Sequence, residues 1–116
     1  QISVSSVASI EDASLSFSDA VGWELYPKAL ESLQTSTWRS RAYGDFLSHV
    51  LVAEGAVDIA IEPQLNVWDM AAFAAIVQEA GGTVTGLDGE GFLQAGNAVS
   101  TNGLVHDQAL NIINSR

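Results

Sequence analysis

The chain has 116 residues, 47% of them hydrophobic and 16% charged, and its fourteen acidic and four basic side chains give a net charge of −10. This size suits a single globular domain, and so acidic a surface argues against binding to nucleic acid or to acidic membranes. No apolar run reaches the ~18 residues of a membrane span, and the lack of cysteine excludes disulfides, thiolate metal sites and thiol nucleophiles. A reducing cytoplasm is the default location for such a chain.

The first third of the chain predicts three strands and one helix. Residues 2–8 and 13–19 alternate between serine and apolar side chains, which is typical of strands with one buried face. Because only a short turn separates them, we expect these two strands to pair antiparallel. Residues 24–34 have apolar side chains at helical spacing, and Pro27 fits the first turn, where its missing N–H costs little. Residues 36–41 predict a short strand.

The middle of the chain predicts two helices with a strand between them. Residues 45–55 have the apolar spacing of a helix that ends at Gly55. Residues 56–63 form a compact run with β-branched side chains on one face, which predicts a strand. Residues 66–82 predict an alanine-rich helix that two glycines end.

The last third predicts two strands and a closing helix. Residues 83–92 read as a strand followed by a turn at Asp88 and Gly89, residues 97–103 as a second strand, and residues 104–114 as a helix. Strands that alternate with helices are typical of an α/β fold. We therefore expect one α/β domain, residues 1–116, with a mixed β-sheet sandwiched between helices.

Three carboxylates fall where strands end and helices begin. Asp45 and Asp69 open two of the predicted helices, and Glu62 lies at the end of the strand between them. In an α/β sheet these positions share one edge, so the three side chains are expected to converge there. Each also has a simpler interpretation, as a helix cap for Asp45 and Asp69 and as a solvated strand-end acid for Glu62. For Asp69 the functional alternative is a hard oxygen ligand for Mg²⁺.

The other ionisable residues have mainly structural interpretations. Asp58 lies within a predicted strand and is expected to pair with Arg41 or with a backbone donor. Arg41 is one of only four cations and is expected either to be paired or to bind an anion. His49 falls inside a helix and predicts a packed or surface side chain, whereas His106 is expected to satisfy local backbone groups. No Ser/His/Asp arrangement has convincing spacing.

The segment WDMAAFAAIVQEAGG, residues 68–82, resembles the C-terminal signature of the inositol monophosphatase superfamily. LVAEGAVDIAIEP at 51–63 resembles the helix, glycine and strand that precede this signature, and AVSTNGLVH at 98–106 resembles its closing segment. Within the superfamily, RAYGDF at 41–46 is most similar to bacterial histidinol-phosphate phosphatases. The resemblance covers residues 39–106, and we expect it to extend over the whole chain.

The resemblance implies roles for particular residues. It implies the C-terminal domain of the sugar-phosphatase/inositol monophosphatase-like fold, with Asp69 as a catalytic residue and ligand of Mg²⁺. Glu62 matches the acid that contacts the alcohol portion of the substrate, and Asp45 and Arg41 would shape substrate recognition. An acidic Asp45 would suit a substrate with a cationic amine and an imidazole.

The superfamily's other metal ligands lie in an N-terminal domain with a D-P-x-D-G-T-type motif, and this chain has no such motif. The chain also lacks an initiator Met and a signal peptide, so we expect it to be the C-terminal half of a two-domain phosphatase and inactive alone. The predicted whole is a cytoplasmic, homodimeric enzyme that hydrolyses histidinol phosphate in histidine biosynthesis. The alternatives are an inositol phosphate or 3′-phosphonucleotide phosphatase, or a non-catalytic binding or dimerisation domain.

Overall fold

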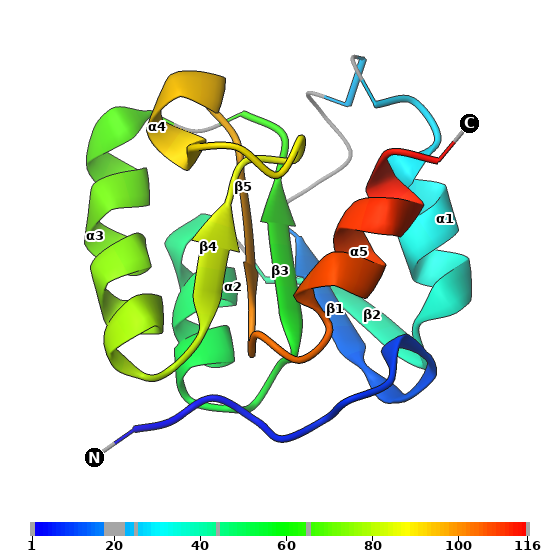
Figure 1. The fold of residues 1–116 in the computed structure, drawn as a ribbon, viewed down its shortest axis with the longest axis horizontal. Helices are drawn as coiled ribbons and strands as arrows, with labels where there is room; N and C mark the ends of the chain where they lie inside the picture. Colours follow the sequence, from blue (N-terminus) through cyan, green and yellow to red (C-terminus); the bar gives the residue numbers. More distant parts are fainter. Residues whose placement is uncertain (1, 18–22, 25, 44, 65, 116) are drawn as a thin grey trace.

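The computed structural model describes residues 2–17, 23–24, 26–43, 45–64 and 66–115, without the side chains of Asp45, Phe46 and Val67. Figure 1 shows a central sheet with helices on both of its faces. None of the described helices is long and apolar enough to cross a membrane.

The sheet has five strands in the order β2-β1-β3-β5-β4. The strands are β1 (Ser14–Phe17), β2 (Arg39–Ala42), β3 (Ile59–Glu62), β4 (Thr83–Thr85) and β5 (Ala98–Thr101). β1 pairs parallel with β2 and β3, whereas β5 pairs antiparallel with β3 and β4. The expected α/β fold with a mixed sheet is therefore confirmed.

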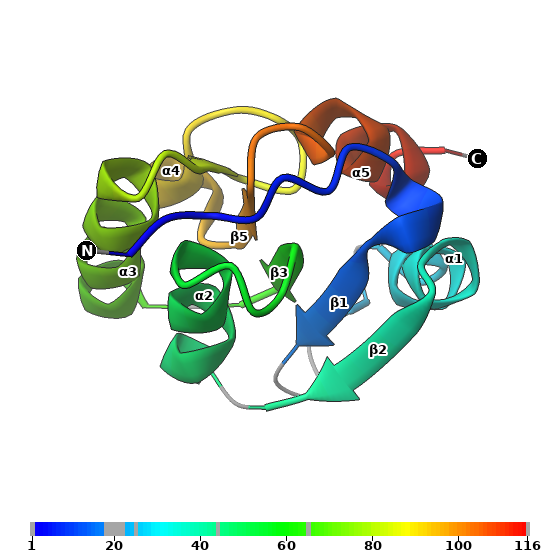
Figure 2. The ribbon, with the colours of Figure 1, turned by 90° about the horizontal axis from the view of Figure 1, so that it is seen from below.

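Two pairs of helices cover the two faces of this sheet. The helices are α1 (Ala29–Ser36), α2 (Asp45–Ala53), α3 (Val67–Glu79), α4 (Phe92–Ala95) and α5 (His106–Ile113), with a short 3₁₀ turn at Ile10–Asp12. Seen from below, α2 and α3 lie on one face and α1 and α5 on the other (Figure 2). The expected arrangement of a sheet between helices is present.

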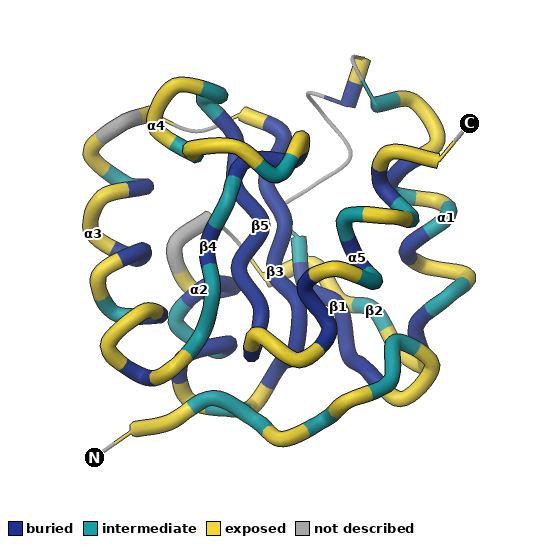
Figure 3. Tube along the Cα trace, in the orientation of Figure 1, coloured by how far each residue is buried: buried dark blue, intermediate teal, exposed yellow. Residues whose placement is uncertain are grey.

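Each face of the sheet buries its own apolar cluster, because successive side chains of a strand point to opposite faces. Ile59 and Ile61 of β3 pack into the cluster under α1 and α5, whereas Ala60 packs under α2 and α3. Phe73 and Met70 of α3 are fully buried in the second cluster. The tube coloured by burial shows β3 and β5 as the buried centre of the molecule (Figure 3).

Residues 2–8 do not form the predicted strand. Figure 1 shows this N-terminal segment running along the edge of the sheet opposite the arrowhead of β3. The N–H of Val4 donates to the carbonyl of Ala80 at 3.1 Å, and Nδ2 of Asn102 donates to Val7 O at 2.7 Å. The expected antiparallel pairing with 13–19 is also wrong, since β1 has parallel neighbours on both sides. The alternation of serine and valine does not form a strand here. The hydrogen bonds of this segment go to Ala80, at the end of α3, and to the loop residue Asn102.

Helix boundaries and one connection also differ from the predictions. α1 begins at Ala29, so Pro27 precedes the helix instead of lying in its first turn. Gly89 has φ +87°, and the N–H of Glu90 bonds the Asp88 side chain at 2.9 Å, so the predicted turn forms. The short helix α4 then separates it from β5, and this helix was not predicted. Part of the predicted strand 13–19, residues 18–19, lies outside the described residues.

Candidate active site

The carboxyl ends of three parallel strands meet at one edge of the sheet. Phe17 of β1 lies in register with both Ala42 of β2 and Ile61 of β3. α2 begins three residues after β2 ends, and α3 begins five residues after β3 ends, so both helices start at this edge. Figure 1 shows the arrowhead of β3 and the first turn of α3 on the same side of the molecule. In open α/β sheets this edge is where ligands bind.

Asp69 lies in the first turn of α3, but it is not the residue that caps the helix. The cap is Asn66, whose Oδ1 accepts the backbone N–H of Asp69 at 3.0 Å and whose carbonyl accepts that of Met70 at 3.3 Å. The Asp69 side chain is partly exposed, and among the described residues its carboxylate accepts no hydrogen bond. The capping interpretation therefore fails for this side chain, which stays available at a helix start that favours negative charge.

Glu62 is the last residue of β3, and its side chain is only 2% exposed. It lies two positions after Ala60, so it points to the face of the sheet that α2 and α3 cover. The interpretation as a solvated strand-end acid is wrong, because β3 is a central strand with neighbours on both sides. Burying a carboxyl group is costly without compensating interactions, which marks Glu62 as more than a surface acid.

Asp58 lies just before β3 and away from Arg41. It is buried and accepts hydrogen bonds from the Ser14 N–H at 2.7 Å, from Ser14 Oγ at 3.1 Å and from Ser5 Oγ. The backbone-donor interpretation is thus confirmed, and the pairing with Arg41 is wrong. Arg41 is exposed on β2, an edge strand of the sheet. The Asp45 side chain lies outside the described residues, although the residue itself begins α2 at the candidate edge.

A buried polar cluster between α2 and the sheet was not predicted from the sequence. Ser16 Oγ and Ser48 Oγ are 2.7 Å apart, and Nδ1 of His49 is 2.7 Å from Ser100 Oγ. The His49 ring stacks on Phe73 with 3.8 Å between centroids. His49 is therefore packed, as expected. The signal for this cluster in the sequence was two serines at inward-facing strand positions, Ser16 in β1 and Ser100 in β5.

His106 satisfies side chains, not the backbone groups expected of it. Its Nε2 lies 2.9 Å from Thr85 Oγ1 and its Nδ1 lies 3.0 Å from Thr101 Oγ1. Burial lowers the pKa of His106, and the neighbouring Asp107 carboxylate partly opposes that shift. His106 thus joins β4 and β5 to the start of α5, a structural role.

Acid is expected to destabilise the protein through His49. Burial lowers the pKa of His49 from 6.5 to about 3. Between these two pH values the imidazole of His49 is protonated in the unfolded chain and neutral in the folded chain. The stability that neutral His49 provides is complete above pH 6.5 and is lost between pH 6.5 and pH 3, by up to about 1.4 kcal/mol per pH unit. Urea unfolding of the full-length protein at pH 7, 6, 5 and 4 measures this slope.

The matched variant is His49→Phe, which keeps a ring against Phe73 and removes the titrating group. Its free energy of unfolding should fall less steeply with acid than that of the parent. Equal slopes would mean that His49 does not titrate on unfolding in this range. Since Ser100 loses its partner in this variant, only the slope, not the absolute stability, tests the prediction.

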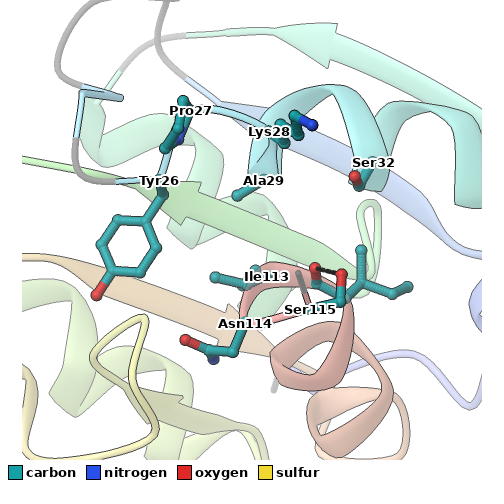
Figure 4. A pocket seen from close by; sticks show the side chains of 9 residues that line it. Tyr26, Pro27, Lys28, Ala29, Ser32, Ile113, Asn114 and Ser115 are labelled. Atoms are coloured by element: carbon teal, nitrogen blue, oxygen red, sulfur yellow. Dashed lines mark hydrogen bonds between the residues drawn. The ribbon is translucent and has the colours of Figure 1, made fainter.

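A cavity of about 400 Å³ lies away from the candidate carboxylates. It sits between the start of α1 and the end of α5, and its lining includes Tyr26, Lys28, Ser32 and Asn114 (Figure 4). These helices cover the face of the sheet opposite to α2 and α3. This cavity therefore belongs to a different layer from Asp69 and Glu62.

The described residues do not make a complete metal site. No group of three or more His, Cys, Asp or Glu side chains within the described ranges could hold an ion. Mg²⁺ binds through oxygen ligands in near-octahedral geometry, and the partly exposed Asp69 could supply one of them, whereas Glu62 at the same edge is buried. The described residues thus fit one position of a magnesium site, and the other ligands would have to come from outside them.

The model of the inositol monophosphatase family matches residues 2–115. The chain belongs to the inositol monophosphatase family. It is 55% identical to the histidinol-phosphatase of Mycobacterium tuberculosis and 48% identical to that of Streptomyces coelicolor, over 99% and 100% of its length. These matches cover 45% and 44% of the two relatives, so the chain spans less than half of their length.

Solved structures of the family share this fold. The inositol monophosphatase of Thermotoga maritima matches 98% of the chain and 45% of its own, with a TM-score of 0.87 and 34% identity. An inositol monophosphatase/NADP phosphatase solved with Mg²⁺ and phosphate matches the whole chain with a TM-score of 0.84 and 24% identity. That second likeness shows the fold alone.

Proposed function

We propose that this chain is the C-terminal domain, residues 1–116, of a phosphatase that hydrolyses histidinol phosphate to histidinol and inorganic phosphate. The observation that supports the substrate is the 55% identity to a histidinol-phosphatase over nearly the whole chain. The family match supports the reaction class, which is hydrolysis of a phosphomonoester. A cytoplasmic homodimer acting in histidine biosynthesis is part of the proposal.

In this proposal Asp69 supplies one ligand to a catalytic Mg²⁺. Its support is that the Asp69 carboxylate lies at a helix start that Asn66 caps, at the same edge of the sheet as the end of β3, where Glu62 is buried. The remaining ligands come from an N-terminal domain outside this chain, and the chain alone is inactive. Bound Mg²⁺ would supply electrophilic stabilisation of charge on the phosphate.

The other proposed residues recognise the substrate. Glu62 contacts the alcohol group that leaves, and Arg41 helps to hold anionic oxygen as a planar guanidinium can. Asp45 at the start of α2 recognises the cationic amine or the imidazole. Opposite charge at that position would favour histidinol phosphate over a neutral sugar alcohol phosphate.

The proposal predicts an uneven loss of activity in Asp45→Ala. In the full-length protein, kcat/KM for histidinol phosphate should fall about tenfold to a hundredfold. This factor corresponds to the loss of one hydrogen bond between charged groups in the transition state. For inositol 1-phosphate, which has no cation, kcat/KM should change little. Steady-state release of phosphate with Mg²⁺ measures both values.

Three outcomes of the same assay oppose the proposal. An equal loss on both substrates would remove Asp45 from substrate selection. If the parent protein prefers inositol 1-phosphate, the substrate is wrong. That second candidate has its own support, a fructose-1,6-bisphosphatase/inositol-1-monophosphatase of Thermotoga maritima with 35% identity over 98% of the chain. A parent that hydrolyses no phosphomonoester, 3′-phosphonucleotides included, would favour a binding or dimerisation domain.

A further inference from the structure

The inner side of α2 changes in character along the helix. Its last turn packs into the apolar cluster under α2 and α3 through Val52 and Ala53. Nearer its start, the inward-facing residues are Ser48 and His49, which are polar and fully buried. Apolar side chains of similar volume would pack there without the cost of desolvating polar groups. The polar residues in this half of α2 therefore need an explanation other than the burial of apolar area.

Two hydrogen bonds from these adjacent positions tie α2 to two different strands. Oγ of Ser48 lies 2.7 Å from Oγ of Ser16 in β1. Nδ1 of His49 lies 2.7 Å from Oγ of Ser100 in β5. Ser16 and Ser100 are both register partners of Ala60 in β3, so the two bonds lie on either side of the central strand. We call them the anchoring pairs. One bond alone would let the helix pivot, whereas two directional bonds fix both its position and its angle on the sheet.

A ring stack joins α2 to α3, the neighbouring helix on this face (Figure 2). The centroids of the His49 and Phe73 rings are 3.8 Å apart, with 10° between the ring planes. His49 comes four residues after Asp45 at the start of α2, and Phe73 comes four residues after Asp69 in the first turn of α3. The stack therefore lies about one helical turn further along each helix than the two candidate residues. It fixes the spacing between the starts of the two helices.

We infer that the anchoring pairs are positioning contacts, which hold the start of α2 so that the backbone of Asp45 stays where this residue can select the substrate. The inference rests on the proposed function, because it takes Asp45 as the residue that recognises the cationic part of the substrate. Hydrogen bonds depend steeply on distance and angle, and a misplacement of about 1 Å can cost an enzyme a large part of its rate. A helix start held by apolar contacts alone would place Asp45 less sharply and would discriminate less between substrates.

Hydrogen exchange of the full-length protein tests the anchoring without using its activity. Ser100→Ala removes the partner of His49, and Thr101→Val, at the next position of β5, removes a partner of His106 at the start of α5. Both hydroxyl residues are fully buried, and they face opposite sides of the sheet. We expect Ser100→Ala to speed amide exchange in α2 roughly fivefold, and Thr101→Val to speed it in α5 but not in α2. Unchanged exchange in α2, or equal acceleration of α2 by both variants, would overturn the inference.

A double-mutant cycle with Asp45 tests the consequence for the substrate. In the full-length protein, Ser100→Ala should lower kcat/KM for histidinol phosphate roughly tenfold, because the start of α2 is no longer held. In the Asp45→Ala background the same substitution should have little further effect, since the anchoring pair acts through Asp45. Thr101→Val should leave kcat/KM at the parent value in both backgrounds. Equal losses from Ser100→Ala in the two backgrounds would show a general loosening of the fold and would overturn the inference.

The two experiments separate a failure of the anchoring from a failure of the proposed function. A parent that does not hydrolyse histidinol phosphate, but whose α2 loosens in Ser100→Ala, would refute the proposed function and the role of Asp45 in it, while the anchoring of α2 stands. An active parent whose α2 exchanges at the same rate in Ser100→Ala would refute the anchoring alone. If Ser100→Ala does not fold, Ser16→Ala removes the other anchoring pair and gives the same two measurements.

Discussion

Asp69→Asn in the full-length protein is expected to lower kcat by about a thousandfold, since metal coordination is worth several kcal/mol of transition-state stabilisation. The substitution keeps the shape of the side chain and removes the charge that binds the cation. Stability should hardly change, because the helix cap is Asn66 and not Asp69. Steady-state kinetics over a range of Mg²⁺ concentrations, with urea unfolding of the same samples, measures both effects.

Asp107→Asn is the matched control for this variant. Asp107 is an exposed acid in the first turn of α5, so its loss removes the same favourable charge from a helix start. Its kcat should equal that of the parent. If Asp69→Asn keeps full activity while it loses stability, the carboxylate serves the helix and not the reaction.

Asp58→Ala is expected to lower the free energy of unfolding by about 3 kcal/mol or more. The carboxylate is buried and accepts hydrogen bonds from the N–H and Oγ of Ser14 and from Ser5 Oγ. Its removal leaves buried donors without a partner, and it frees the N-terminal segment from the start of β1 and β3. Urea unfolding of the full-length protein gives the change in free energy.

The control for Asp58→Ala is Asp12→Ala, which removes an exposed acid from the nearby 3₁₀ turn. Surface substitutions of this kind usually stay within about 0.5 kcal/mol. Limited proteolysis adds a local readout, since Asp58→Ala should open the segment around Ser5 to cleavage. Similar midpoints for the two variants would mean that the Asp58 hydrogen bonds contribute nothing net.

The sequence predicts the fold correctly where the apolar pattern of a segment by itself decides its secondary structure. The β-branched alternation of β3 and the apolar spacing of α3 are both visible in the sequence. Because the strand ends where the helix begins, they also place Glu62 and Asp69 at the same edge of the sheet. Residues 2–8 show the same alternation as a strand. Their hydrogen bonds go to Ala80 and Asn102, which are distant in sequence, so local pattern could not reveal their state.

The environment of the candidate residues was harder to predict than their position. Glu62 reads as a strand-end acid, and its burial depends on β3 having both β1 and β5 as neighbours. The partner of His49 is Ser100, fifty-one positions later in the chain. The cap interpretation of Asp69 failed because Asn66, three residues earlier, also has a side chain suited to capping. The backbone geometry of Asn66, φ −83° and ψ 158°, and its hydrogen bond to the Asp69 N–H identify it as the cap.

The most direct test of the account is a crystal structure of the full-length protein soaked with Mn²⁺ and phosphate, with the ions located by anomalous scattering. The account predicts a Mn²⁺ ion coordinated directly by a carboxylate oxygen of Asp69, with its other protein ligands from outside residues 1–116. Mn²⁺ bound beside phosphate with the Asp69 side chain turned away from every ion would contradict it.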